Sequence, residues 1–132
     1  MADGTKIIGV HLSPENKLLL IRKDGIWDFP GGSMRPEEKD HDCLIRTITG
    51  EQFPYCTLKI HDLINLFFVG DYDECERILA YKVEIKSNIA VGECFQEADY
   101  LSLEDISKIK GDYQISKVVN QLIIKFNKMG LL

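Results

Sequence analysis

The hydrophobic and polar positions at the start of this chain follow the pattern of β-strands. Residues Lys6 to Leu12 and Lys17 to Arg22 are rich in aliphatic side chains, and the turn-forming segment Ser13 to Asn16 separates them. The pattern predicts two strands, the second of them buried. The run Trp27 to Gly32, WDFPGG, contains several residues that break regular structure and predicts a loop.

A helix is predicted from Pro36 to about Thr49. Proline suits the first turn of a helix, and the acidic residues that follow it suit the positive end of the helix dipole. Leu44 and Ile48 form an i, i+4 apolar pair. Gly50 and Pro54 mark the expected end of the helix.

Two long apolar runs follow, Asp62 to Val69 and Glu76 to Ile85, and the residues 70–73 between them, GDYD, predict the tip of a hairpin. Ser102 to Asp105 indicates a helix cap with a short helical turn. The last element is an amphipathic helix over Ile115 to Lys128, because apolar residues recur there at helical spacing.

Asp112 is the expected N-cap of this last helix. The order of elements is strand, strand, loop, helix, strand, strand, helix, which predicts an α+β domain built on a sheet. The chain has 132 residues, enough for one modest core, so we expect residues 1–132 to form a single domain.

The charge balance of the chain narrows its partners. The formal net charge is -5, which argues against general binding to nucleic acid or to a membrane surface, since both are negatively charged. A few local cations still suffice to hold a phosphate. No apolar stretch approaches membrane length and the first residues do not have the form of a signal peptide, so we expect a cytoplasmic protein.

The four cysteines do not suggest a metal site or a disulfide scaffold. They stand at positions 43, 56, 75 and 94, with no C-x-x-C pair among them. We expect four reduced, structural thiols.

The segment from Gly31 to Glu51 carries the candidate chemistry. Two glycines allow a tight turn and close approach by a ligand, and the start of the helix that follows offers unpaired N–H groups. By itself this pattern is weak evidence of function, because most such sites are plain turns.

The spacing within this segment is more specific. Five residues separate Gly32 from Glu38, and seven separate Glu38 from Arg46. Together with the upstream WDFPGG, this spacing resembles the Nudix (MutT-like) signature, G-x5-E-x7-R-E-U-x-E-E-x-G-U, in which U is a bulky apolar residue. The motif covers about 25 residues, whereas the order of elements resembles the family over nearly the whole chain.

The resemblance implies an α/β/α sandwich around a mixed sheet. It also implies a pyrophosphatase, a hydrolase that cleaves a pyrophosphate bond in a nucleoside diphosphate linked to another group, with Mg²⁺ or Mn²⁺ as cofactor. Helical carboxylates at i, i+3 and i+4 share one face and hold the metal, which activates water and neutralises the diphosphate. The early Glu and the Arg, here Glu38 and Arg46, would form an ion pair that braces the loop against the helix.

The metal-binding part of the motif is degenerate in this chain. The first two carboxylates are replaced by Thr47 and Gly50, and only Glu51 remains as the candidate metal ligand and catalytic residue. Many members of the family recruit one more acid from a late loop, and Glu93 or Glu97 could serve here. The loss of two negative charges should weaken the binding of a divalent ion strongly.

Further residues could contact phosphates, although a solvated surface charge is the plainer interpretation of each lysine and arginine. The candidate phosphate loop consists of Gly31 and Gly32. The cationic candidates lie on either side of it in the sequence: Arg22, Lys23 and Arg35.

Two functions therefore remain open. The chain is either a divergent hydrolase of low activity or a catalytically inactive module that binds a nucleotide-like small molecule or a protein partner. The retained glycine loop favours the first, and the depleted helix favours the second. An unrelated α+β protein with a chance match to the signature is a third interpretation. The sequence identifies neither the substrate nor the oligomeric state.

Overall fold

The computed structural model describes residues 4–54, 56–70, 75–86, 97–109 and 114–129. Its elements, in chain order, are β1 (Thr5–Val10), β2 (Leu18–Lys23), β3 (Ile26–Asp28), β4 (Gly31–Ser33), α1 (Asp40–Leu44), the π-helix η1 (Ile45–Gln52), β5 (Thr57–Gly70), β6 (Cys75–Lys86), β7 (Glu97–Leu101), α2 (Leu103–Ile109) and α3 (Lys117–Met129).

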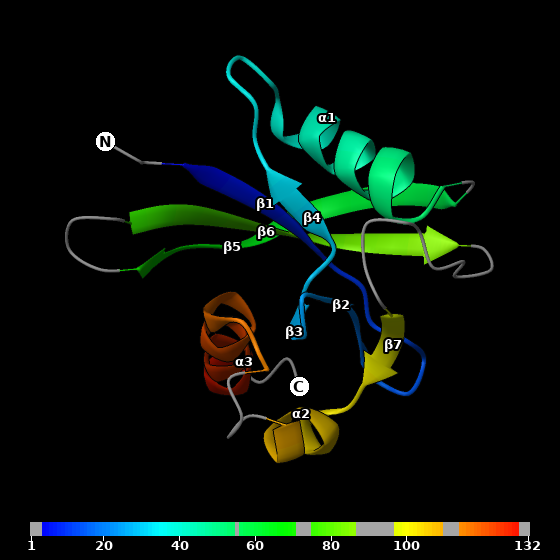
Figure 1. Cartoon of the computed structure of the whole chain (residues 1–132), viewed down its shortest axis with the longest axis vertical. Coiled ribbons are helices and arrows are strands. Elements are labelled where there is room, and N and C mark those ends of the chain that lie inside the picture. Colours follow the sequence, from blue (N-terminus) through cyan, green and yellow to red (C-terminus); the bar gives the residue numbers. More distant parts are fainter. Residues whose placement is uncertain (1–3, 55, 71–74, 87–96, 110–113, 130–132) are drawn as a thin grey trace.

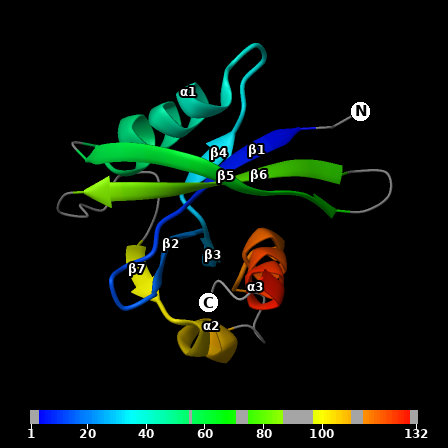
Figure 2. The same cartoon turned by 180° about the vertical axis from the view of Figure 1, so that it is seen from behind.

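The strands form two sheets. The larger has the order β4-β1-β6-β5 and is mixed, because β1 runs parallel to β6 while the other neighbours are antiparallel. The smaller has the order β3-β2-β7 and is antiparallel. Figure 1 shows α1 and η1 on one side of the larger sheet, and α3 on the other. The view from behind in Figure 2 agrees, so the layers are those of an α+β sandwich.

The core is divided between the two faces of the larger sheet. Alternate residues of β1 point to opposite faces. Ile7 packs with Leu44 and Ile48 of the helix above the sheet. Ile8 packs with the group that includes Val119 of α3 below it. Each helix therefore buries its apolar stripe on its own face, as the i, i+4 pair and the terminal stripe predicted.

The predicted hairpin is confirmed. β5 and β6 pair antiparallel from Thr57↔Lys86 to Gly70↔Cys75, with register shifts between Ile60 and Asn65. Both strands extend beyond the predicted runs, because pairing with the neighbouring strand carries the ladder into polar flanks. The rest of the predicted tip, residues 71–73, lies outside the described residues.

The prediction that the first helix begins at Pro36 was wrong. The helix begins at Asp40. Glu37 has φ of +65°, which a right-handed helix does not allow. The Glu38 N–H donates to the Arg35 carbonyl at 3.1 Å, so residues 35–38 form a β-turn with Pro36 at its second position. Proline serves the turn here and not the helix.

The predicted loop Trp27 to Gly32 was also too simple. It contains the ends of two short strands, β3 and β4, which belong to different sheets. Strand β7, from Glu97 to Leu101, was not predicted either. It pairs with β2 over five residues, and its mixed polarity gives no clear β-period.

The last helix is confirmed, but its start differs from the prediction. α3 begins at Lys117, and the Ser116 hydroxyl accepts the Val119 N–H at 3.1 Å, which makes Ser116 the N-cap. The predicted cap, Asp112, lies outside the described residues. Ile115 is extended and not helical, because it pairs in parallel with Trp27 of β3. The short capped helix after Ser102 is confirmed by reciprocal bonds between Ser102 and Asp105.

None of the helices in the described part of the chain is long and apolar enough to span a membrane.

We expect Gly31→Ala to destabilise the protein by roughly 3 kcal/mol, because φ is +127° there and a Cβ would collide with the Ile7 carbonyl oxygen across the β4–β1 ladder. Gly50→Ala is the matched control. A Cβ there meets nothing within 4 Å, so alanine should stabilise the helix by up to about 1 kcal/mol. Urea unfolding of both variants measures the difference. Equal stability of the two variants would contradict this account of β4.

Candidate functional site

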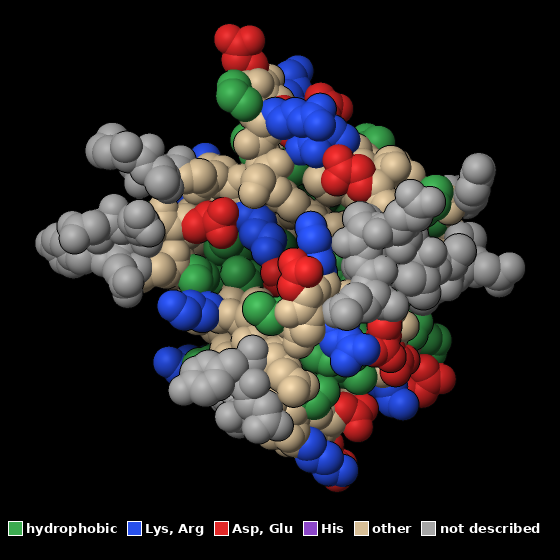
Figure 3. Space-filling model, viewed as in Figure 1, with side chains coloured by type: hydrophobic (Ala, Val, Ile, Leu, Met, Phe, Trp, Pro, Cys, Tyr) green, Lys and Arg blue, Asp and Glu red, His purple; other side chains and the backbone are tan. Residues whose placement is uncertain are grey.

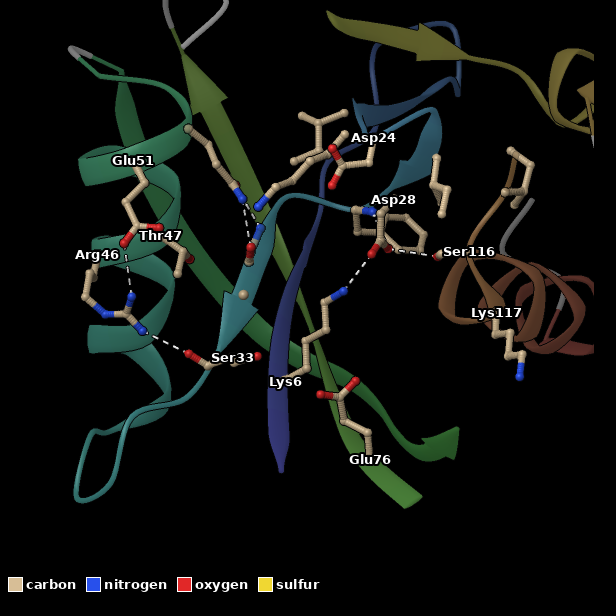
Figure 4. Close-up of a pocket in the computed structure, with 18 residues that line it drawn as sticks. Lys6, Asp24, Asp28, Ser33, Arg46, Thr47, Glu51, Glu76, Ser116 and Lys117 are labelled. Atoms are coloured by element: carbon tan, nitrogen blue, oxygen red, sulfur yellow. Dashed lines mark hydrogen bonds and ion pairs between the residues drawn. The ribbon is translucent and has the colours of Figure 1, made fainter. Parts of the chain in front are cut away.

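A cleft of about 840 Å³ lies where the two sheets and the start of α3 meet. Gly31, Gly32 and Ser33 of β4 form one wall, and η1 stands behind them (Figure 4). Four apolar side chains contribute to the lining of the cleft, Ile21, Ile26, Phe29 and Ile115; Ile26 is exposed and the other three are buried. The rest of the lining is formed by charged and polar side chains: Lys6, Lys23, Asp24, Asp28, Arg46, Thr47, Glu51, Gln52, Glu76, Ser116 and Lys117.

Acidic and basic side chains are mixed in this region and do not form a patch of one sign. The space-filling view shows the same mixture across the middle of that face of the molecule (Figure 3). The charges around the cleft therefore differ from the basic stripe of a nucleic-acid-binding protein. A ligand with charge would be recognised by individually placed groups.

Arg46 and Glu38 form the predicted ion pair. The guanidinium binds both carboxylate oxygens, from Nε to Oε2 at 2.8 Å and from Nη2 to Oε1 at 3.0 Å. Nη2 also donates to the Ser33 carbonyl at 2.9 Å, which ties the helix to β4. The hydrogen bonds from Arg46 and from the Arg35 N–H lower the pKa of Glu38 to about 2. Because the bonds are bidentate and partly buried, they fix the loop and the helix relative to each other.

The helix changes its hydrogen-bond pattern after Leu44. From Ile45 to Gln52 it is a π-helix, and the Phe53 N–H donates to the Ile48 carbonyl five residues back at 2.7 Å. Residues five apart therefore lie closer in direction than they would in an α-helix. This brings Glu51 towards Arg46, whose Nη1 contacts Glu51 Oε1 at 3.2 Å. The one remaining helical carboxylate is thus part of the brace.

The same spacing aligns Thr47 with Gln52 on the side facing β4. The Gln52 amide forms two hydrogen bonds with Gly31, accepting its N–H at 2.9 Å and donating to its carbonyl at 2.8 Å. Both groups of Gly31 are thereby satisfied at the free edge of the strand. Sequence reasoning missed Gln52, because a buried glutamine in a helix gives no signal unless the π-turn is known.

Thr47 is only 2% exposed and packs directly on Gly32. Its hydroxyl donates to the Cys43 carbonyl at 2.8 Å. A Cβ on Gly32 would lie 2.9 Å from Thr47 Cγ2, so glycine is needed for this close approach. The Cys43 thiol lies beside it, within 3.5 Å of the Gly32 carbonyl, and burial raises its pKa to about 11. Such a thiol is structural and unreactive at neutral pH.

A second polar node lies in the middle of the cleft. Lys6 of β1 donates from Nζ to Asp28 Oδ2 at 2.6 Å (Figure 4). The other oxygen of Asp28 accepts the Phe29 N–H at 2.8 Å and the Ser116 hydroxyl at 2.9 Å. The node joins both sheets and the start of α3, and it holds an ammonium group in the cleft. No motif predicts this node, since Lys6, Asp28 and Ser116 are far apart in the chain.

Comparison with known proteins gives no match among protein families or curated sequences. Solved structures do match. The MutT protein of Methanosarcina mazei superposes with a TM-score of 0.78 at 16% identity, covering 98% of this chain and 96% of that one. A NUDIX hydrolase of Nitrosomonas europaea gives 0.77 at 13%, covering 96% and 89%. The Ap4A hydrolase of C. elegans gives 0.67 at 18%, covering 98% and 97%.

The chain has the Nudix fold. The resemblance inferred from the glycine loop, Glu38 and Arg46 is therefore confirmed at the level of the fold. At these identities the superpositions show the fold alone.

The Nudix resemblance implies a divalent ion, and the helix does not provide a suitable set of ligands. Thr47 turns its hydroxyl to a backbone carbonyl, Gly50 has no side chain, and Glu51 is paired with Arg46. Mg²⁺ prefers several hard oxygen ligands in an open, hydratable position. Among the residues that the structure describes, no group of three or more His, Cys, Asp or Glu side chains could hold a metal ion.

The structure brings together only some of the candidate residues of the Nudix site. Gly31, Gly32, Lys23 and Glu51 line the cleft. Arg35 lies in the β-turn before the helix and is exposed, so it does not line the cleft.

Arg22 and Glu97 likewise do not line it. They form an ion pair with each other at 2.9 Å on neighbouring strands, and Arg22 stacks on Trp27. Glu93 lies outside the described residues. The role of each candidate therefore stays a prediction.

The lowered pKa of Glu38 predicts a specific dependence of stability on pH. A carboxylate whose folded pKa is about 2, against an ordinary 4.5, stabilises the native state above pH 4.5, and this contribution is lost as the pH falls towards 2. We expect the native protein to be more stable than Glu38→Gln at pH 7, and the difference to shrink between pH 5 and pH 2. Urea unfolding over this range measures it. Glu37→Gln, at an exposed neighbouring position, is the control, and a pH-independent difference for Glu38→Gln would argue against the brace.

Gln52→Leu should destabilise the protein by about 2 kcal/mol or more, because it leaves the buried N–H and carbonyl of Gly31 without their side-chain partners. Thermal unfolding followed by circular dichroism measures the loss. Gln114→Leu, at an exposed position, should have little effect. If the two variants melt alike, the Gln52 amide does not hold β4.

Proposed function

We propose that this protein binds a nucleotide-derived small molecule through its diphosphate, with the cleft beside β4 as the binding site. The observation that carries the proposal is the cleft itself, which is lined by apolar side chains, a glycine strand and separate cationic side chains. Small-molecule sites are typically of this size and mixed character. The exposed side chain of Ile26 suits contact with a nucleoside, and the polar and cationic side chains suit phosphates.

Support for a phosphate subsite comes from the glycine strand. Gly31 and Gly32 line the cleft, and Gln52 and Arg46 fix the backbone of their strand from the helix. A ligand can therefore approach a backbone that is already ordered, which lowers the entropy lost on binding. Lys23 also lines the cleft and is exposed.

The second candidate function is hydrolysis of a pyrophosphate bond in such a ligand. It is supported by Glu51, which lines the cleft and is 49% exposed even though it contacts Arg46. In this proposal Glu51 is the catalytic residue and the metal ligand, with Mg²⁺ or Mn²⁺ gained together with the diphosphate. The hydrolase names of the structural neighbours are consistent with it. The buried hydroxyl of Thr47 and the missing side chain of Gly50 favour binding over fast turnover.

A combined binding and turnover screen tests the proposal. The panel consists of ADP, UDP, ADP-ribose, sugar nucleotides and dinucleoside polyphosphates, with Mg²⁺ or Mn²⁺. We expect calorimetry to detect binding of at least one nucleoside diphosphate derivative, and turnover to be slow or undetectable. Gly50→Glu restores one helical carboxylate at a position with open space, so it should raise turnover.

Two variants make the outcome specific. Gly50→Gln adds a side chain of the same size without the charge and should not raise turnover. Glu51→Gln should abolish whatever turnover the native protein has. Fast native turnover that is lost in Glu51→Gln would establish the hydrolase over the binding module. The absence of binding and turnover for the whole panel, with or without metal, would overturn the proposed function.

A further inference from the structure

The ammonium group of Lys6 lies in the cleft, paired with Asp28, and the sequence motif does not include this residue. We infer that the protein binds the diphosphate of its ligand without a divalent ion, and that Lys6 is the fixed cation of the site. The inference rests on the proposed function, because it concerns the same ligand and the same cleft.

The helix does not offer a suitable set of ligands to a divalent ion. A divalent ion in this fold would need the oxygens of the π-helix. The Thr47 hydroxyl, however, donates a hydrogen bond to the Cys43 backbone carbonyl, and the Thr47 side chain packs against Gly32. The remaining carboxylate, Glu51, already faces the guanidinium of Arg46 at 3.2 Å. A metal bound there would have to compete with that positive charge, which repels it.

The position of Lys6 suits contact with a phosphate group. It stands opposite Ser33 in the β1–β4 ladder, so its side chain leaves the sheet beside the glycine strand. Figure 4 shows it crossing the cleft towards Asp28. Its side chain is only 19% exposed, which leaves it little freedom to move. The ammonium group is therefore placed in advance for a ligand on β4.

Asp28 holds the ammonium group of Lys6 in place. The carboxylate is fixed by the Phe29 N–H and the Ser116 hydroxyl and then accepts one N–H from Lys6. An ammonium group has three N–H donors. Within the described residues Asp28 is the only acceptor that Lys6 contacts, so the other two donors are available to phosphate oxygens. Charge-assisted bonds of this kind are about twice as strong as neutral ones.

Further cations can supplement Lys6 from the rim. Lys23 of β2 and Lys117 at the start of α3 both line the cleft and are exposed. Asp24, Glu76 and Asp28 also line it and oppose a negative ligand. Lys6 should contribute most to the attraction of a negative ligand, because it is partly buried, whereas water and salt screen the exposed charges at the rim more strongly.

The test is calorimetry with ADP and UDP as probes, in EDTA and in Mg²⁺, with adenosine and uridine as controls without phosphate. We expect the diphosphates to bind in EDTA with an affinity within about twofold of that in Mg²⁺. Lys6→Met should weaken this binding about tenfold or more, since it removes a charged hydrogen-bond donor. Lys59→Met, which removes an exposed lysine on β5 outside the cleft, should leave it unchanged.

Lys6→Arg keeps the positive charge and should retain most of the affinity, even if Lys6→Met proves too unstable to measure. Thermal unfolding checks that each variant is folded. Binding that appears only in Mg²⁺ would overturn the inference and leave the proposed function intact. Full affinity in a folded Lys6→Met protein would overturn the role of Lys6. If neither diphosphate binds in EDTA or in Mg²⁺ while other members of the wider panel bind, only the inference is overturned. If no member of the panel binds, both the inference and the proposed function are overturned.

Discussion

The close contact between β4 and η1 is the constraint on which the rest of the cleft depends. Thr47 can pack on Gly32 only because glycine has no side chain, and Gly31 can adopt its positive φ only for the same reason. Gln52 and Arg46 then bind the backbone of the strand from the helix. With β4 held in this way, β1 and Lys6 have a fixed place beside it.

The π-helix determines which side chains meet across this contact. In an α-helix, Arg46 and Glu51 would point in different directions, because five residues exceed a turn of 3.6 by more than a third of a turn. In η1 their directions are closer, and they pair. The same change brings Gln52 onto the face of Thr47. A local change in backbone hydrogen bonding thus uses the last helical carboxylate in the brace and supplies a neutral amide at the glycine strand.

Much of the fold could be predicted from local pattern, because each apolar stripe faces one core. The terminal helix and the β5–β6 hairpin followed from periodicity, and the Glu38–Arg46 pair followed from spacing within a known motif. Prediction was poorer where tertiary contacts override local preference. Pro36 indicated a helix start but lies in a turn, and a loop was predicted where β3 and β4 pair with distant strands. The π-turn has no sequence signature, so Gln52 could not be found.

In the proposed site the two cations of the cleft have different roles. Arg46 has its donors engaged by Glu38, Glu51 and Ser33, so it serves the scaffold and has little left for a ligand. Lys6 is oriented by one strong bond and keeps donors in reserve. A scaffold that fixes one cation completely and another only partly can give up its helical carboxylates and still offer a diphosphate an ordered positive charge. Retention of the Nudix fold is therefore compatible with the loss of the metal ligands, because the brace and the ligand contact rest on different residues.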